Sequence, residues 1–257
     1  MTRDVVVDAD ADAGYERDLL SAQALDPAVA AVNGQSSLVR GDPSGLTING
    51  QMLTRVQLQN FINSSKCLDA MSNAKGSKIP SYLLEYGSTA YGGDGKAAVC
   101  LGNPDTADNT AVCVPGLGQT VSSYIGNSDA TNLYLQMASS DPSHSPAVIQ
   151  WMGYDAPGFS NVASQNAAIN GAHLLTAAVA GLQATHQGLP GNLTVIGHSY
   201  GSTTAADACT LDGMRPTNLV LIGSPGAGHA NTAADLGLPP GPLRGLGQPG
   251  PGHPNTG

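Results

Sequence analysis

The sequence predicts an α/β fold in which a mainly parallel sheet carries helices on both faces. From residue 80 onward, short apolar runs alternate with segments of helical periodicity, and strands separated by helices pair in parallel. Glycine-rich turns follow several of these runs. The 257 residues suffice for one domain with a sizeable core and a loose extension.

Residues 1–79 predict a helical N-terminal extension. The segment is rich in Ala, Asn and Ser, and its helical pieces contain apolar residues: Met52, Leu53, Val56, Phe61, Ile62, Leu68 and Met71. Three carboxylates near the start resemble half of a calcium loop: Asp8, Asp10 and Asp12. The position that needs Gly is Ala13 and the position that needs Glu is Leu19, so an acidic helix start is the better interpretation.

Residues 80–236 form the predicted core, which opens with a hairpin. Runs 82–86 and 96–101 flank the glycine-rich segment 91–95. The run 110–114 predicts the next strand, which leads into Pro115-Gly-Leu-Gly118. A helix then begins at Asp129 and presents one apolar face: Ala130, Leu133 and Met137.

The second half of the core repeats this alternation. A strand at 147–151 precedes a long helix that starts near Ser160. Its core stripe has helical spacing: Ile169, Ala172, Leu175, Val179 and Leu182. A strand at 193–196, a helix with a small face (Ala205, Ala206, Cys209) and a strand at 218–222 complete it. The tail, 237–257, is rich in Gly and Pro and predicts disorder.

The composition excludes several classes of partner. The charged fraction is 11% and the formal net charge is −9, so the basic patch that neutralises nucleic-acid phosphates is missing. Attraction to anionic membranes is disfavoured likewise, and no window reaches the ~18 apolar residues of a spanning helix. The N-terminus lacks the apolar core of a signal peptide, which predicts a cytoplasmic protein. The sequence leaves the oligomeric state open.

The four cysteines match no zinc pattern and are expected to be buried small hydrophobes. Cys100 and Cys113 suggest a disulfide across a hairpin. If another strand lies between theirs, they are about 10 Å apart at ~4.8 Å per strand, beyond the ~7 Å limit for a bridge. We therefore expect free thiols.

The segment 192–211 predicts a strand, a sharp turn and a helix, with Ser199 at the tip of the turn. Gly197 and Gly201 lie two residues before and after it, where a strained turn packed against strand and helix needs glycine. This Gly-x-Ser-x-Gly arrangement is typical of a nucleophile elbow. The alternative is an ordinary strand-to-helix turn whose serine caps the helix.

A serine nucleophile needs donors for the oxyanion and a base for its proton. The backbone N–H of Tyr200 follows the serine and is one expected donor. The second comes from the loop after the strand that ends at Val114, where we select Leu117; the alternative for that loop is a plain turn. The expected oxyanion hole therefore consists of the N–H groups of Leu117 and Tyr200.

The sequence does not supply an evident base. His198 adjoins the serine and points away from it, so we expect it to pack or to hydrogen-bond elsewhere. The base should follow the acid and the serine along the chain, and only His229 and His253 follow the serine. His229 comes too soon after its strand and His253 lies in the tail. Asp155 is expected to be a solvated carboxylate, and three other histidines are assigned to loop or helix surfaces: His144, His173 and His186.

Five segments resemble, in order and spacing, an actinobacterial α/β-hydrolase family long labelled a domain of unknown function: 102–109, 114–118, 151–157, 195–202 and 221–226. The resemblance covers about residues 80–236. It implies an α/β-hydrolase fold, Ser199 as nucleophile, no metal or organic cofactor, and activity on a small-molecule or lipid-like ester.

The chain departs from that family after Leu236. Members continue with an Asp-Pro segment and a Gly-His motif, whereas this chain turns Gly/Pro-rich, which suggests a C-terminally incomplete fold through a shifted frame or an early end. Two hypotheses follow: a serine hydrolase, or an inactive remnant or binding module without the triad histidine. We expect no histidine on Ser199 and ester hydrolysis no faster than by Ser199→Ala, unless the tail delivers His253 with Asp235 or Asp155.

Overall fold

The computed structural model describes the core of the chain and a few short pieces before it. The described residues are 47–48, 51–52, 63, 66–67, 70–71, 73–74, 76–87, 90–158, 165–189 and 191–238. The predicted tail beyond residue 238, the acidic start of the chain and His253 lie outside them. The division into extension, core and tail therefore stays a prediction.

A six-stranded sheet forms the centre of the molecule, in the order β3-β4-β6-β5-β7-β8. Its strands span the following residues: β3 Ser81–Gly87, β4 Lys96–Leu101, β5 Asn109–Val114, β6 Pro146–Met152, β7 Asn192–His198 and β8 Asn218–Ile222. The pairs β3–β4 and β4–β6 are antiparallel, and β6, β5, β7 and β8 pair in parallel. The predicted hairpin and the mainly parallel sheet are confirmed.

The parallel register brings the carboxyl ends of four strands to one edge of the sheet. Val114 pairs with Gly197, and His198 pairs with Ile222. Because β4 is antiparallel to β6, its first residues also reach this edge, where Ala97 pairs with Met152. The loops that leave this edge are therefore neighbours in space, as ligand sites of open α/β sheets require.

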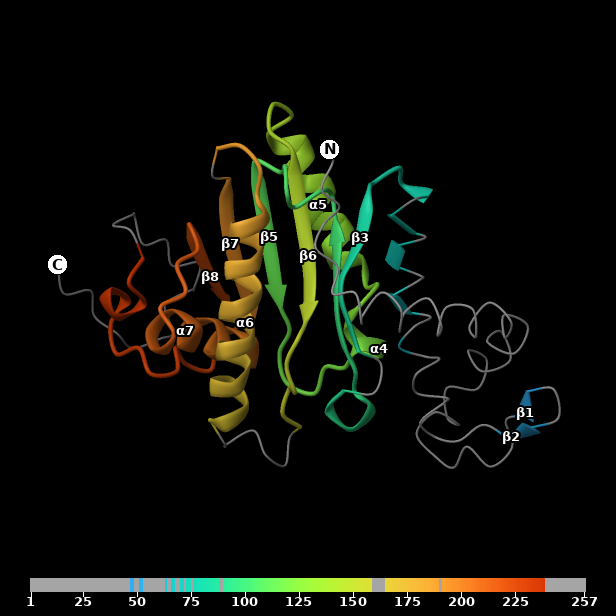
Figure 1. Ribbon diagram of the computed structural model, residues 1–257. Coiled ribbons are helices and arrows are strands. Elements are labelled where there is room, and N and C mark those ends of the chain that lie inside the picture. The colour runs from blue at the N-terminus through green and yellow to red at the C-terminus, as the bar shows by residue number, and fades with distance from the viewer. Residues whose placement is uncertain are drawn as a thin grey trace, which may run out of the picture.

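Helices cover both faces of the sheet (Figure 1). The helical elements are α4 Val121–Tyr124, α5 Ser128–Ser140, α6 Asn166–Thr185 and α7 Tyr200–Leu211, with short 3-10 turns η1 Tyr91–Gly93 and η2 Ala233–Leu236. In Figure 1, α6 lies in front of the sheet and α5 behind it. One core cluster fills the α6 and α7 side, and a smaller one packs Val148 and Ala111 against Ala130 of α5.

The predicted helical stripes are largely confirmed. Ala172, Leu175 and Val179 of α6 are buried, as is the small face of α7. The helix predicted from Ser160 begins at Asn166 in the structure, and residues 159–164 lie outside the described part. α4 was not predicted, because its four residues carry no periodicity and Thr120 caps them through its side chain.

One element of the N-terminal extension differs from the prediction. Met52, expected in a helical piece, lies in β2 (Gln51–Met52), which pairs antiparallel with β1 (Thr47–Ile48). Asn-Gly between the two strands explains the difference, because this dipeptide strongly favours a two-residue hairpin. The described residues of 63–76 are helical, and Cys67 and Ala74 among them are fully buried.

The expected separation of Cys100 and Cys113 is confirmed. Cys100 lies in β4 and Cys113 in β5, and β6 runs between these strands. All four cysteines are free thiols, and burial raises the pKa of Cys113 to about 12. The thiols therefore remain protonated at neutral pH and pack as small side chains.

The crossing of β7 and α7 has no room for side chains at two glycines. A Cβ on Gly197 would lie 2.6 Å from the carbonyl oxygen of Gly201 and 2.6 Å from the Cα of Ser202. A Cβ on Gly201 would meet the carbonyl oxygens of Val114 and Pro115. These neighbours are all backbone atoms, so they move only if the strand, helix or loop moves.

This crossing gives a test of the fold. Gly197→Ala should destabilise the protein by about 1–3 kcal/mol, because overpacking against backbone forces a shift. Gly181→Ala, in the exposed interior of α6 with no atom near its Cβ position, should stabilise it by up to about 1 kcal/mol. Urea unfolding of both variants measures the difference, and a neutral Gly197→Ala would contradict the close approach.

Candidate active site at the carboxyl edge of the sheet

Ser199 lies at the sharp turn between β7 and α7. Its backbone has φ 53° and ψ −125°, a left-handed conformation that is costly for a residue with a side chain, by about 1–3 kcal/mol. Its side chain makes no capping hydrogen bond to α7. The expected strained turn is therefore observed, and the alternative of a helix-capping serine is not.

Three hydrogen bonds hold this turn in its conformation, one of them from the Ser202 N–H to the carbonyl oxygen of Ser199 at 2.9 Å. The Ser199 N–H donates to the carbonyl oxygen of Ile222 at 2.8 Å, which ties the turn to the end of β8. The Ser202 hydroxyl donates to the carbonyl oxygen of Ser199 at 2.5 Å. The peptide groups on both sides of Ser199 are thus fixed, while its side chain remains half-buried and accessible.

The loop after β5 lies directly against Ser199. A Cβ on Gly116 would lie 2.8 Å from the Cβ of Ser199 and 3.3 Å from its Oγ. Residue 116 must therefore be glycine for the loop to approach this closely. The predicted neighbourhood of the 115–118 loop and the turn is confirmed.

The hydrogen bonds of this loop single out one N–H group. The Gly118 N–H donates to the carbonyl oxygen of Pro157 at 2.9 Å. The Leu117 N–H makes no hydrogen bond within the described part of the chain. Tyr200 is the first residue of α7, and first-turn N–H groups point out of a helix at its N-terminus. The assignment of Leu117 and Tyr200 as oxyanion donors stays a prediction.

Three tyrosine hydroxyls bind backbone carbonyl oxygens at this edge, a feature that the sequence analysis missed. Tyr154 donates to Pro115 at 2.7 Å, Tyr124 to Cys113 at 2.9 Å and Tyr91 to Gly153 at 2.8 Å. The one sequence signal is the preference for Tyr over Phe, eight against two, because only Tyr carries a hydrogen-bonding tip.

The rim beside the end of β6 is acidic. Burial, then Glu85 and Asp155, raise the pKa of Tyr91 to about 12. Burial, then Asp155, also raise the pKa of Asp94 above its ordinary value. Asp155 itself is exposed, as expected. This negative charge disfavours anionic ligands at the rim.

The histidine that follows Ser199 in the described chain is held elsewhere. The His229 ring hydrogen-bonds to buried Asp207 through Nδ1 and Oδ1, 3.0 Å apart, and the backbone N–H of His229 donates to the same oxygen at 2.8 Å. Asp207 lies eight residues into α7, about 12 Å along the axis from Ser199 at ~1.5 Å per residue. His229 is therefore not the partner of Ser199.

The other described histidines also lie away from the serine hydroxyl. His198 is exposed beside Gly223 and makes no side-chain hydrogen bond within the described part of the chain, so the expected packing or hydrogen-bonding role is not observed there. His144 and His173 pair with Asp141 and Asp212 on the surface, and His186 binds the carbonyl oxygen of Ala107. Among the described residues, none hydrogen-bonds to Ser199 Oγ.

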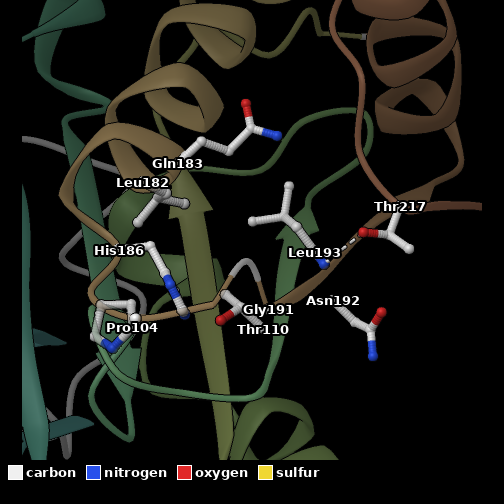
Figure 2. Close-up of a pocket in the computed structure, with 10 residues that line it drawn as sticks. Pro104, Thr110, Leu182, Gln183, His186, Gly191, Asn192, Leu193 and Thr217 are labelled. Atoms are coloured by element: carbon white, nitrogen blue, oxygen red, sulfur yellow. Dashed lines mark hydrogen bonds between the residues drawn. The ribbon is translucent and has the colours of Figure 1, made fainter.

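A separate cavity of about 320 Å³ lies at the opposite edge of the sheet (Figure 2). It is lined where β5 and β7 begin, by Thr110 and Leu193, and by Leu182 and His186 from the end of α6. The length of β7, about 20 Å at ~3.3 Å per residue, separates this cavity from Ser199. It therefore plays no part in the chemistry of the serine.

No three His, Cys, Asp or Glu side chains gather as a metal site within the residues that the structure describes. None of the described helices is long and apolar enough to cross a membrane. The candidate site thus consists of Ser199, the loop against it and the backbone N–H groups around them.

Comparison with known proteins decides the family. A sequence model described as "Alpha/beta hydrolase" matches residues 92–243, more than half of the chain. The chain belongs to the alpha/beta hydrolase family. The resemblance to an actinobacterial family is also confirmed by relatives from mycobacteria.

This alpha/beta hydrolase is 42% identical over 207 residues to "Uncharacterized protein Rv2079" of Mycobacterium tuberculosis. The match covers 78% of the chain and 31% of that relative, so the chain spans about a third of its length. "Uncharacterized protein Mb0988c" of Mycobacterium bovis is 34% identical over 154 residues, which are 56% of the chain and 57% of that protein.

Solved hydrolase structures are more distant from this alpha/beta hydrolase. An alpha/beta hydrolase enzyme from a Medee basin deep-sea metagenome library matches with TM-score 0.35 and 17% identity over 56% of each chain. A carboxyl esterase from Bacillus coagulans matches with TM-score 0.30 and 18% identity over 56% of this chain and 43% of its own.

The surface pair of His144 and Asp141 gives a test of the electrostatics. The hydrogen bond to Asp141 and its charge raise the folded-state pKa of His144 above 6.5. The stabilisation is therefore complete below pH 6.5 and is lost as the pH rises through the raised value. In an NMR titration, His144 should titrate above its ordinary pKa and Asp141→Asn should lower that pKa; no response to the substitution would contradict the pair.

Proposed function

We propose that Ser199 is the nucleophile of an ester hydrolase, with the N–H groups of Leu117 and Tyr200 as the oxyanion hole. The observation that carries this proposal is the strained, uncapped Ser199 with the Gly116 loop packed against it. Strain at a non-glycine residue persists only where the surroundings hold it, and it concentrates at functional sites. The family relationship supports the same reaction class.

The reaction divides into two steps. Ser199 Oγ attacks the ester carbonyl carbon while a base removes its proton, and the carbonyl oxygen becomes an oxyanion that accepts hydrogen bonds from the two N–H groups. When this tetrahedral intermediate collapses, the alcohol leaves with the proton and the acyl group stays bound to Ser199 as an acyl-serine. Water then attacks the acyl carbon while a base removes its proton, and the same donors stabilise the second oxyanion. The bond between the acyl carbon and Oγ breaks as Oγ takes up that proton, which releases the acid product and restores the Ser199 hydroxyl.

The acidic rim favours an uncharged ester, either a small molecule or a lipid-like one. Asp94 and Asp155 lie on loops that leave the same sheet edge as Ser199. An anionic acyl or alcohol group there would meet like charge, which disfavours its binding. The esterase named among the distant structures is compatible with this substrate class.

A second function is favoured by one specific observation. His229, the histidine after Ser199 in the described chain, is bound to Asp207 about two helical turns away. A chain without a base on Ser199 would keep the strained turn and the loop against it but lose most of its turnover, since a general base contributes about 10²–10⁴-fold. Such a chain is a binding module or an inactive remnant of a hydrolase.

Adding a base to the buffer distinguishes the ester hydrolase from the binding module. We expect the wild type and Ser199→Ala to hydrolyse a short p-nitrophenyl ester equally in plain buffer, because none of the described histidines reaches the serine. Imidazole in the buffer should raise the wild-type rate about tenfold or more above that of Ser199→Ala, since it replaces the base. Ser199→Ala corrects for the ester cleavage by imidazole itself.

Two results would change these conclusions. Equal rates at every imidazole concentration would overturn the nucleophile and favour the binding module. A wild-type advantage without imidazole that His253→Ala abolishes would support the hydrolase and assign the base to His253. His229→Ala is the matched control, because its ring is held by Asp207 and its loss should leave the rate unchanged.

A further inference from the structure

Tyr154 lies fully buried beneath the loop that touches Ser199. Its hydroxyl donates to the carbonyl oxygen of Pro115 at 2.7 Å. Its ring stacks on Trp151, with ring centroids 5.9 Å apart and planes within 4°. A Cβ on Gly171 of α6 would lie 2.7 Å from the ring, so the helix also closes over it. The hydroxyl therefore has a fixed position.

The segment that carries Tyr154 holds the loop at two points. Tyr154 binds Pro115, one residue before Gly116, and Pro157 accepts the hydrogen bond of Gly118. The Leu117 N–H lies between these two anchors. Its direction relative to Ser199 is thus set from the end of β6.

We infer that Tyr154 is a positioning residue, which aims the Leu117 N–H at the oxyanion by holding the Pro115 carbonyl. This inference rests on the proposed function of Ser199. Tyr154 makes no hydrogen bond to Ser199 Oγ and acts through the loop, where it binds Pro115. Oxyanion donors work because they are fixed before the charge develops, so a loop free to move stabilises that charge less.

The hydroxyl of Tyr154 serves this role throughout the neutral range. Burial raises its pKa above the ordinary value, so the group stays protonated and donates. A phenylalanine in its place keeps the ring and its packing but leaves the Pro115 carbonyl without this donor. Tyr154→Phe therefore removes only the hydroxyl, with its hydrogen bonds to the Pro115 carbonyl oxygen and to Thr204, and leaves the ring in place.

Tyr124 supplies a matched control. Its hydroxyl donates from α4 to the carbonyl oxygen of Cys113 at 2.9 Å. Cys113 is held in β5 by its pairing with β6 and β7, so this bond does not set the position of the 115–118 loop. Tyr124→Phe removes a similar bond, two residues away, without releasing the loop.

The experiment measures imidazole-supported ester hydrolysis and amide exchange in the full chain. Removing a whole oxyanion donor costs about 10²–10³-fold, and loosening one should lower kcat about tenfold with KM within about twofold. Tyr154→Phe should show this loss and faster hydrogen exchange at the Gly118 N–H, whose bond to Pro157 depends on the loop. Tyr124→Phe should show neither change, and urea unfolding checks that both variants are folded.

The exchange measurement separates this inference from the proposed function. If all variants react no faster than Ser199→Ala while Tyr154→Phe alone speeds exchange at Gly118, the nucleophile fails and the hold on the loop stands. If Tyr154→Phe keeps both kcat and slow exchange, the inference is overturned. It is also overturned if Tyr124→Phe changes kcat and exchange as much as Tyr154→Phe does, because the effect is then general destabilisation.

Discussion

The close approach of backbone to backbone at the end of β7 is the constraint on which the site depends. Three glycines permit it: Gly197 against α7, Gly201 against the 114–115 carbonyls and Gly116 against Ser199. Each contact is tighter than a side chain allows. The strained conformation of Ser199 persists because β7, α7 and the 115–118 loop all pack against the same turn. None of them can move without displacing the others.

Tyrosine side chains that donate hydrogen bonds stabilise the backbone around this edge of the sheet. Loops that leave a sheet carry carbonyl groups that the ladder no longer satisfies, and such groups need partners when they are buried. Tyr154 and Tyr91 provide them for Pro115 and Gly153, and Tyr124 adds a hydrogen bond to Cys113 within β5. The rings of Tyr154 and Tyr124 also pack in the core. The same residues thus contribute to the core and to the order of the loops around the serine.

Local pattern predicted the strands, the helix faces and the turn at Ser199, because each depends on residues close together in sequence. The Gly-x-Ser-x-Gly spacing even indicated where the backbone would be strained. Contacts between distant segments were not predictable in this way. The bond of Tyr154 to Pro115 spans 39 residues, and the pair of Asp207 and His229 spans 22. The helix prediction at Met52 was wrong although the deciding signal is local, because the Asn-Gly pair that favours a hairpin directly precedes β2.

The hydrogen bond from Ser199 N–H to Ile222 makes the serine dependent on the outermost strand of the described sheet. β8 has five residues and pairs on one side, and its Ile222 end is half exposed. The free energy needed to open a short edge strand is lower than the free energy needed to open a central strand of the same sheet. Each brief opening of that strand end releases the Ser199 peptide and lets its strain relax. Local fraying of β8, and not global unfolding, therefore limits how long Ser199 keeps its reactive geometry.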